Sequence, residues 1–315
     1  YVETATIYGV KVEKVLVIGG GQQGIDLALK AFINPGDVIL VEDPTYLAFL
    51  QLANSYEGVC KGVKANDDGL DLEDLEAKIK KYSPKMLYCV PTFSNPTGKT
   101  YSDANRRAIA EMTAKYGVMV IEDDPYSKLR FKGEYVPSMK SYDKAGNVIF
   151  ISSFSKIISP GNRTGVAVAD PAVIRKMEIG KQGTDLHTPN LSQMITYEYL
   201  RRGYLKPDLE KAVEIYGRKK GAMSAAINKY MPEEFRCTDP DGGLFIWGKL
   251  PECIDTVKLL PEAIARKVAY IQGSVFFADG SGTNYIRLNY SYADIARIEE
   301  GIARLAELFK EKLAK

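Results

Sequence analysis

Lys156 lies in a segment whose residue types could support the chemistry of a reactive amine. The segment reads ISSFSKIISPGNR over residues 151–163, with serines before the lysine and Arg163 after it. An amine becomes a nucleophile or a base near neutral pH only when burial or a nearby cation lowers its pKa. The apolar run VIFI that leads into the segment predicts partial burial. The competing interpretation is a loop lysine that points into water, and the segment alone leaves both open.

A glycine-rich turn is a candidate site for a phosphate group. GGGQQG, residues 19–24, follows the apolar run VLVI and precedes IDLALKAFI, which has the spacing of a helix. The turn contains G-x-G-x-x-G, and Glu42 stands at the end of the next predicted strand, as in sites for a nicotinamide dinucleotide. Glycine and the N–H groups at a helix N-terminus would equally suit another phosphorylated cofactor. Both classes of cofactor remain open on this turn alone.

Other polar and aromatic side chains occur where predicted strands end. The segments SNPTG, EDDPY and DPTY contribute an amide, a carboxylate and two phenols: Asn95, Asp123, Tyr126 and Tyr46. SNPTG also has the composition of a simple turn. Together with the glycine turn, Lys156 and Arg163, these side chains form a set that a hydride-transferring enzyme does not need. A pyridoxal phosphate (PLP) enzyme needs all of it, because that cofactor requires a lysine for its imine, an acid for its ring nitrogen, donors for its ring oxygen and cations for its phosphate.

The elements that must position these groups alternate along the first part of the chain. Strand and helix patterns succeed each other from residue 15 to residue 122, and two more strands are expected at 147–152 and 163–169. Such alternation predicts an α/β fold with a mostly parallel sheet flanked by helices, whose ligands lie at the carboxyl ends of the strands. The loops after Ile18, Val41, Val90 and Ile121 should therefore share one rim.

The pattern changes after Pro171. Long helical segments lead to the probable strands GGLFIWGKL and YIRLNYS and to a last helix, which together predict a smaller α+β domain at the C-terminus. We expect a large cofactor-binding domain over residues 1–200 and a small domain over residues 201–315.

Composition excludes several classes of function. Forty-two Lys and Arg against 40 Asp and Glu give a net charge of +2, which predicts no nucleic-acid or membrane partner. Four scattered cysteines and one histidine provide no zinc motif, so no metal is expected. No apolar run approaches the roughly 18 residues of a transmembrane helix. We expect a soluble, cytoplasmic protein.

Taken in order, the motifs resemble those of one family. GGGQQGIDLAL, DPTY, NPTG, EDDPY, SSFSK with PGNRTG, KQGTDLHT, GGLFIW and YIRLNYS are similar to the motifs of fold type I, PLP-dependent aminotransferases of class I/II. The resemblance covers essentially the whole chain and points to the branch with 2-aminoadipate, kynurenine and archaeal aromatic aminotransferases. It implies transfer of an amino group from an amino acid, aromatic or 2-aminoadipate or similar, to a 2-oxo acid such as 2-oxoglutarate, through ping-pong half-reactions.

The resemblance also implies a role for each matching residue. Lys156 would form the aldimine with the cofactor and shuttle the substrate's proton, while Asp123 would pair with the ring nitrogen. Asn95 and Tyr126 would hydrogen-bond the ring oxygen. Arg287, in YIRLNYS, would bind the substrate carboxylate, with Asn95 beside it. The remaining cofactor contacts would be a stacking ring and a set of phosphate ligands: Tyr46, Gly21, Gln22, Gln23, Ser153 and Arg163.

Some positions depart from the family pattern, and two alternatives remain. Gly21 replaces a usual serine, and Gln272 stands where a proline is usual. Family members carry a further N-terminal segment with an active-site lid and a tyrosine that reaches the neighbouring subunit's cofactor, so we expect that part of the domain to be absent here and the protein to be a homodimer. The alternatives are a PLP-dependent β-lyase or a non-catalytic PLP-binding domain, and a nicotinamide dehydrogenase that uses residues 19–24.

Overall fold

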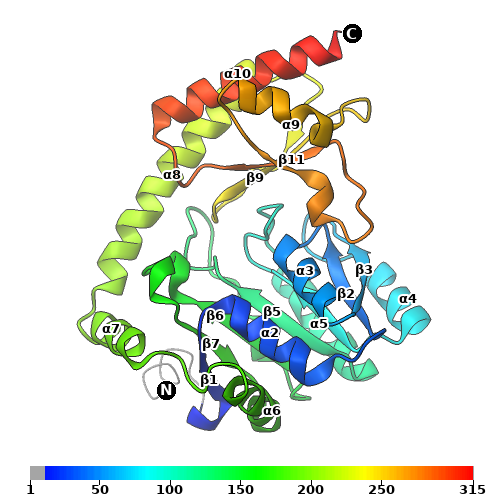
Figure 1. The fold of residues 1–315 in the computed structure, drawn as a ribbon, viewed down its shortest axis with the longest axis vertical. Coiled ribbons are helices and arrows are strands. Elements are labelled where there is room, and N and C mark those ends of the chain that lie inside the picture. The colour runs from blue at the N-terminus through cyan, green and yellow to red at the C-terminus, as the bar shows by residue number, and fades with distance from the viewer. Residues whose placement is uncertain (1–10, 315) are drawn as a thin grey trace.

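The computed structural model describes residues 11–314, in which a seven-stranded sheet forms the larger layer (Figure 1). The strands lie in the order β1-β7-β6-β5-β4-β2-β3. Their bounds are β1 (Val15–Ile18), β2 (Val38–Asp43), β3 (Val59–Lys64), β4 (Met86–Cys89), β5 (Met119–Asp124), β6 (Val148–Ser153) and β7 (Gly165–Val168). The expectation that residues 1–10 belong to the large domain lies outside the described residues.

Six strands of this sheet run in the same direction. β3, β2, β4, β5 and β6 pair in parallel, whereas β7 is antiparallel to both β6 and β1. β1 therefore runs with the parallel set, and only β7 opposes it. The predicted rim is confirmed, because the loops after β1, β2, β4, β5 and β6 all leave the sheet at the same edge.

Helices cover both faces of the sheet, as the strand patterns predict. The alternating residues of β2 show the reason: Ile39 and Val41 join one core with α2, α3 and α6, while Leu40 joins a second core with α4 and α5. Strands buried on both sides are typical of parallel sheets. The helices are α2 (Gly21–Phe32), α3 (Leu47–Ser55), α4 (Leu72–Tyr82), α5 (Asp103–Tyr116) and α6 (Pro171–Gln182).

Local sequence signals fix where these helices begin and end. Asp71 caps α4 by accepting the N–H groups of Glu73 and Asp74, and Ser102 caps α5 in the same way. Gly117 ends α5 in the left-handed conformation, at φ 68°. The alternation of strands and helices predicted for residues 15–122 is confirmed.

A second, antiparallel sheet carries the C-terminal part of the chain. Its order is β10-β11-β9-β8, and it shares a core with the helices around it. The elements are α7 (Asn190–Arg201), α8 (Leu205–Tyr230), β8 (Arg236–Cys237), β9 (Phe245–Lys249), α9 (Thr256–Ala265), β10 (Ile271–Gln272), β11 (Tyr285–Asn289) and α10 (Ile295–Leu313). In Figure 1 α8 runs along one side of the molecule, from the layer of the parallel sheet to the layer of the antiparallel sheet. The fold class is confirmed, and the division after residue 200 stays a prediction.

Short 3₁₀ helices complete the described chain and shape its loops. They are η1 (Val12–Lys14), η2 (Met139–Tyr142), η3 (Phe154–Lys156), η4 (Pro160–Asn162) and η5 (Gly273–Phe276). η3 and η4 lie in the loop between β6 and β7, so they shape the segment around Lys156. Within residues 11–314, every helix is too short or too polar to cross a bilayer.

Candidate active site

A cavity of about 560 Å³ opens at the carboxyl ends of the parallel strands, where the second sheet approaches. The predicted site residues that line it are Gly21, Gln22, Tyr46, Asn95, Asp123, Tyr126, Ser153, Lys156, Arg163 and Arg287. The structure therefore brings together every predicted residue except Gln23. Ala48, Ser155 and Phe245 also line the cavity, although their sequence context did not single them out.

Lys156 ends η3, in the loop that follows β6. Its side chain is open to the cavity, yet the surrounding protein still desolvates the amine. This desolvation lowers the pKa of Lys156, and the positive charges of Arg163 and Arg287 lower it further. Among the described residues, no side chain or backbone group forms a hydrogen bond or an ion pair with this amine. Lys156 therefore has the environment of a reactive amine.

Asp123 is 6% exposed at the end of β5. Its Oδ2 accepts a hydrogen bond from the Tyr88 hydroxyl at 2.8 Å, and the Tyr88 ring stacks on Phe49 with centroids 3.8 Å apart. Burial raises the pKa of Asp123 to about 7, against the opposing effect of the Tyr88 hydroxyl. A cation in the cavity would favour the carboxylate. The protonated ring nitrogen of PLP is such a cation, so this carboxylate fits the cofactor.

Sequence reasoning missed Tyr88 because its role depends on strand register. Tyr88 pairs with Ile121 between β4 and β5, so Asp123, two residues farther along β5, lies on the same face of the sheet. A hydroxyl in the otherwise apolar run KMLYCV was the signal that could have identified it.

Arg287 connects the second sheet to the loop that carries Asn95. Its Nη1 donates to Asn95 Oδ1 at 2.7 Å. The guanidinium carbon lies 4.1 Å from the ring centroid of Phe245 and 5.1 Å from that of Phe276. The Nε atom is buried without a hydrogen-bond acceptor in the described chain. A guanidinium in contact with two aromatic rings, with a donor still unpaired, is suited to a carboxylate ligand.

The glycine turn forms a cradle for an anion at the N-terminus of α2. Gly20 has φ 95°, and a Cβ there would lie 2.7 Å from Nη2 of Arg163. Only glycine therefore allows Arg163 to reach Gly19, whose carbonyl accepts from Nη2 at 2.8 Å. The N–H groups of Gly21 and Gln22 begin the helix, and Arg163 lies beside them in the cavity wall. Backbone donors with an adjacent cation fit the phosphate of PLP.

Hydrogen bonds fix the side chains of three other predicted residues. The hydroxyl of Tyr46 donates to Gln22 Oε1 at 3.4 Å, which places the ring over the start of α2. Ser153 Oγ lies 2.9 Å from the Ser155 hydroxyl. Gln23 turns away from the cavity and accepts the Gly19 N–H at 2.7 Å. A direct contact between its side chain and the cofactor stays a prediction, and its observed contacts support the turn instead.

A buried carboxylate holds the loop of Asn95. Glu42 is 2% exposed and accepts from the N–H of Val90, the hydroxyl of Ser94 and the hydroxyl of Tyr101, at 3.0, 3.0 and 2.7 Å. Burial raises the pKa of Glu42 to about 7, although these three bonds oppose the shift. A carboxylate with these partners is not available to a ribose hydroxyl, which argues against the nicotinamide alternative.

Fold and cavity together define the class of protein. A mostly parallel seven-stranded sheet with a smaller antiparallel domain, and a lysine facing a buried aspartate and an anion cradle, are the features of a fold type I, PLP-dependent enzyme.

Comparison with known proteins identifies the family. The family model "Aminotransferase class I and II" matches residues 3–305, so the chain belongs to this family. It is 41% identical to aromatic-amino-acid aminotransferase 1 of Thermococcus litoralis, over 98% of this chain and 76% of the relative. It is 38% identical to the 2-aminoadipate transaminase of Thermus thermophilus, over 97% of this chain and 78% of the relative. The protein is an aminotransferase, and its cofactor is pyridoxal phosphate.

Solved structures agree with this assignment. The kynurenine aminotransferase of Pyrococcus horikoshii, in complex with PMP, kynurenine and its product, superposes with a TM-score of 0.94 at 42% identity, over 98% of this chain and 78% of that one. LysN of Thermus thermophilus, an α-aminoadipate aminotransferase bound to N-(5′-phosphopyridoxyl)-L-leucine, superposes with the same TM-score at 37% identity, over 99% and 81% of the two chains.

Proposed function

We propose that this aminotransferase uses an aromatic amino acid, 2-aminoadipate or a similar amino acid as donor and a 2-oxo acid such as 2-oxoglutarate as acceptor. The relatives named above, which act on such donors, support this choice. Phe245 and Phe276, whose rings lie close to the Arg287 guanidinium, provide apolar surface beside the proposed carboxylate site. The observation that carries the proposal is the convergence of Lys156, Asp123 and Arg287 on one cavity.

Each residue would contribute a distinct step. Pyridoxal phosphate, when bound, supplies an electrophilic carbon and an electron-withdrawing ring. Lys156 is the covalent anchor, and its amine moves the proton from the substrate's Cα, because its lowered pKa makes the basic form accessible. Asp123 would hold a proton on the ring nitrogen, and Asn95 and Tyr126 would donate to the ring oxygen. Tyr46 would pack against the ring.

Arg287 would bind the carboxylate of the substrate, and the glycine turn would bind the phosphate of the cofactor. Arg287 orients the substrate's α-carboxylate through two parallel hydrogen bonds, which fixes the direction of the Cα–H bond. Gly21 and Gln22, through their N–H groups, hold the phosphate together with Ser153 and Arg163. The carboxylate and the phosphate would therefore both be bound by hydrogen-bond donors that the folded protein already holds in place.

The test is a spectrum followed by a donor panel. Reconstituted enzyme should absorb in the visible range and lose this absorption when an amino acid donor is added. Lys156→Ala should abolish the covalent absorption, while Lys128→Ala, a change at an exposed lysine, should preserve it. Aromatic, 2-aminoadipate, lysine and branched-chain donors should then be ranked by kcat/KM. An unchanged spectrum in Lys156→Ala would exclude the assigned anchor.

We also infer that the enzyme is a cytoplasmic homodimer. α7 supports a dimer, because its only buried residue is Thr196, whereas Leu191, Met194 and Ile195 are more than half exposed. An apolar stripe that faces outward requires a partner surface. Cys237 and Cys253 are exposed free thiols, which suits a reducing compartment.

A further inference from the structure

Lys181 is a buried lysine that the reaction described above does not use. It lies near the end of α6 and is 3% exposed, which makes it the one lysine fully buried within residues 11–314. Its Nζ donates to Oε1 of Gln23 at 2.8 Å and to the two carboxylate oxygens of Asp185 at 2.8 and 2.9 Å. A lysine is rarely buried unless it is paired, so all three of its donors being used points to a defined role.

Lys181 and Asp185 together determine how the Gln23 amide is oriented. The amide oxygen faces the ammonium group of Lys181, and the amide nitrogen donates to Oδ2 of Asp185 at 2.7 Å. A flipped amide would place its NH₂ against the ammonium group and its oxygen against the carboxylate. The pair therefore permits one orientation, in which Oε1 also accepts the Gly19 N–H at 2.7 Å.

Gly19 is thereby fixed through both of its backbone groups. Gln23 holds its N–H, and Arg163 holds its carbonyl at 2.8 Å. Gly20 follows with a positive φ, and then Gly21 begins α2 with the first free N–H groups of the helix. A glutamine at the third helical position that reaches back past the N-cap resembles a capping box, shifted by one residue. The shape of the anion cradle therefore depends on the Gln23 amide.

We propose that Lys181 is a positioning residue for the cofactor's phosphate. It acts through Gln23, whose orientation it sets, and so holds the glycine turn in the shape that presents its N–H groups and Arg163 to the phosphate. This proposal rests on the proposed function, which assigns the phosphate to that turn. Lys181 itself does not line the cavity.

A purely structural role is the competing explanation. α6 packs against α2 independently of Lys181, because Gly180 of α6 lies against Leu27 and the Thr184 hydroxyl, just after α6, accepts from Lys30 Nζ at 2.7 Å. If Lys181 only joined the two helices, its loss would lower stability and leave recognition of the phosphate unchanged. The two explanations differ in whether affinity for PLP falls relative to affinity for pyridoxal, which lacks the phosphate.

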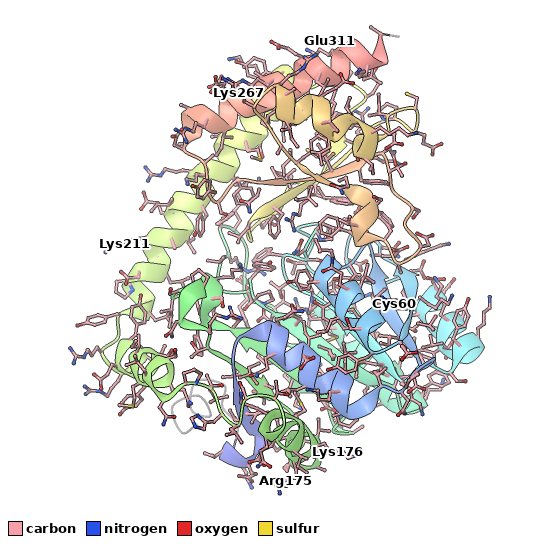
Figure 2. The ribbon with its side chains drawn as sticks, in the orientation of Figure 1. Cys60, Arg175, Lys176, Lys211, Lys267 and Glu311 are labelled. Atoms are coloured by element: carbon pink, nitrogen blue, oxygen red, sulfur yellow. The ribbon has the colours of Figure 1, made fainter. Side chains whose placement is uncertain are left out.

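The experiment compares these two ligands on the cofactor-free full chain. Dissociation constants for PLP and for pyridoxal are measured by absorption titration in the parent, Lys181→Met, Gln23→Met and Lys176→Met. Lys176 lies on the same helix with its side chain at the surface (Figure 2), so it is a matched control. We expect Lys181→Met and Gln23→Met to weaken PLP binding about tenfold or more, the scale of one lost buried hydrogen bond, and to change pyridoxal binding less than twofold. Lys176→Met should change neither.

The double variant and an arginine variant decide the remaining questions. Lys181→Met/Gln23→Met should bind PLP no more weakly than Gln23→Met alone, because the lysine acts through the amide. An unchanged ratio of PLP to pyridoxal affinity in both single variants would overturn the proposal. If Arg163→Met also left that ratio unchanged, the phosphate assignment itself would fail. If Lys181→Met does not fold, the ratio of PLP to pyridoxal affinity in Gln23→Met decides the test. That variant keeps the ion pair of Lys181 and Asp185, so its fold should persist.

Discussion

Asp123 shows how a residue proposed to bind the cofactor can lower the stability of the cofactor-free protein. Burial raises its pKa to about 7, so the folded protein holds this proton more tightly than the unfolded chain, whose aspartate titrates near 3.8. The contribution of Asp123 to stability is therefore full below about pH 4 and is lost as the pH rises through about 7. The protonated ring nitrogen of the bound cofactor would pair with the carboxylate and so offset this loss of stability.

Asp123→Asn should consequently stabilise the cofactor-free protein at high pH. The amide cannot ionise, and its oxygen can still accept the Tyr88 hydroxyl. We expect the free energy of unfolding to rise by roughly 2–4 kcal/mol at pH 8 and to change little at pH 4. Urea denaturation at the two pH values measures this difference. The prediction fails if the variant is less stable than the parent at pH 8. Turnover should fall sharply in the same variant.

Arg287 is the residue at which the substrate's carboxylate should be recognised. We expect Arg287→Met to lower kcat/KM for amino acid donors about 100-fold, since truncating a buried charged partner costs at least about 2 kcal/mol. Arg287→Lys should restore little, because a lysine provides one point charge where the guanidinium provides a planar fork. The dissociation constant of PLP should stay unchanged in both variants, and a large increase in it would show that Arg287 acts on the cofactor instead.

Most single residues of the cavity were predictable, whereas the residues that support them were not. Lys156, Asp123 and Arg287 occur in motifs that the sequence displays directly. Tyr88 and Lys181 contribute through partners that are far along the chain: 35 residues separate Tyr88 from Asp123, and 158 separate Lys181 from Gln23. Such pairs follow from strand register and helix packing, which a single sequence does not specify.

At the scale of elements, Arg106 on α5 fixes the loop that carries Asn95. Arg106 is 1% exposed and donates to Pro91 O and Thr92 Oγ1 at 2.8 Å, and to Tyr101 O at 3.2 Å. The two ends of the loop are therefore joined by one guanidinium group, with Glu42 holding the loop from β2. A loop preorganised in this way keeps its amide in place without the substrate.

Arg106→Met should release this loop and destabilise the protein. Removing the guanidinium leaves several buried acceptors without donors, so we expect a loss of about 3–5 kcal/mol in the free energy of unfolding. Hydrogen exchange in residues 91–101 should accelerate, and KM for amino acids should rise. Arg107→Met, at an exposed neighbour paired with Asp103, is the matched control and should have little effect. Equal effects of the two substitutions would contradict a specific role for Arg106.

The regular elements were predictable to the extent that their length exceeds the period of their apolar pattern. α4 and α5 contribute to the predicted alternation because two or more turns repeat the apolar spacing between clear caps. β8 and β10 have two residues each, too few for a period, and they exist through pairing with β9 and β11. α9 continues through Pro261, which a sequence reading would take as a break.

At the scale of the whole molecule, both sheets contribute to the cavity: Phe245 of β9 and Arg287 of β11 line it together with residues at the carboxyl ends of the parallel strands. The layer of the parallel sheet has a core on each face of that sheet, the layer of the antiparallel sheet has a core of its own, and α8 connects the two layers (Figure 1). The hydrogen bond from Arg287 to Asn95 crosses between these layers. Substrate binding at Arg287 would therefore act on the position of one layer relative to the other.

The surface of α7 extends the same reasoning to a second copy of the chain. On its inner side, Asn162 Nδ2 donates to Thr196 Oγ1 at 2.6 Å, so the helix is joined through polar contacts to the loop that contains Arg163. On its outer side, Met194 and Ile195 line a shallow apolar hollow with Tyr199 and Tyr204. An ordinary surface helix has the opposite arrangement, with its apolar side inward.

Ile195→Glu should therefore dissociate the proposed dimer. A charge in the centre of an apolar interface has no partner there, so the desolvation cost opposes association. Sedimentation velocity should show monomers at micromolar concentration, whereas Val257→Glu, which places the same charge on an exposed apolar position of α9, should leave the dimer intact. Asn162 links α7 to the loop of Arg163. In the monomer, the affinity for PLP should therefore fall more than the affinity for pyridoxal. A parent protein that is monomeric at these concentrations would refute the dimer, and the outward apolar stripe would then need another partner.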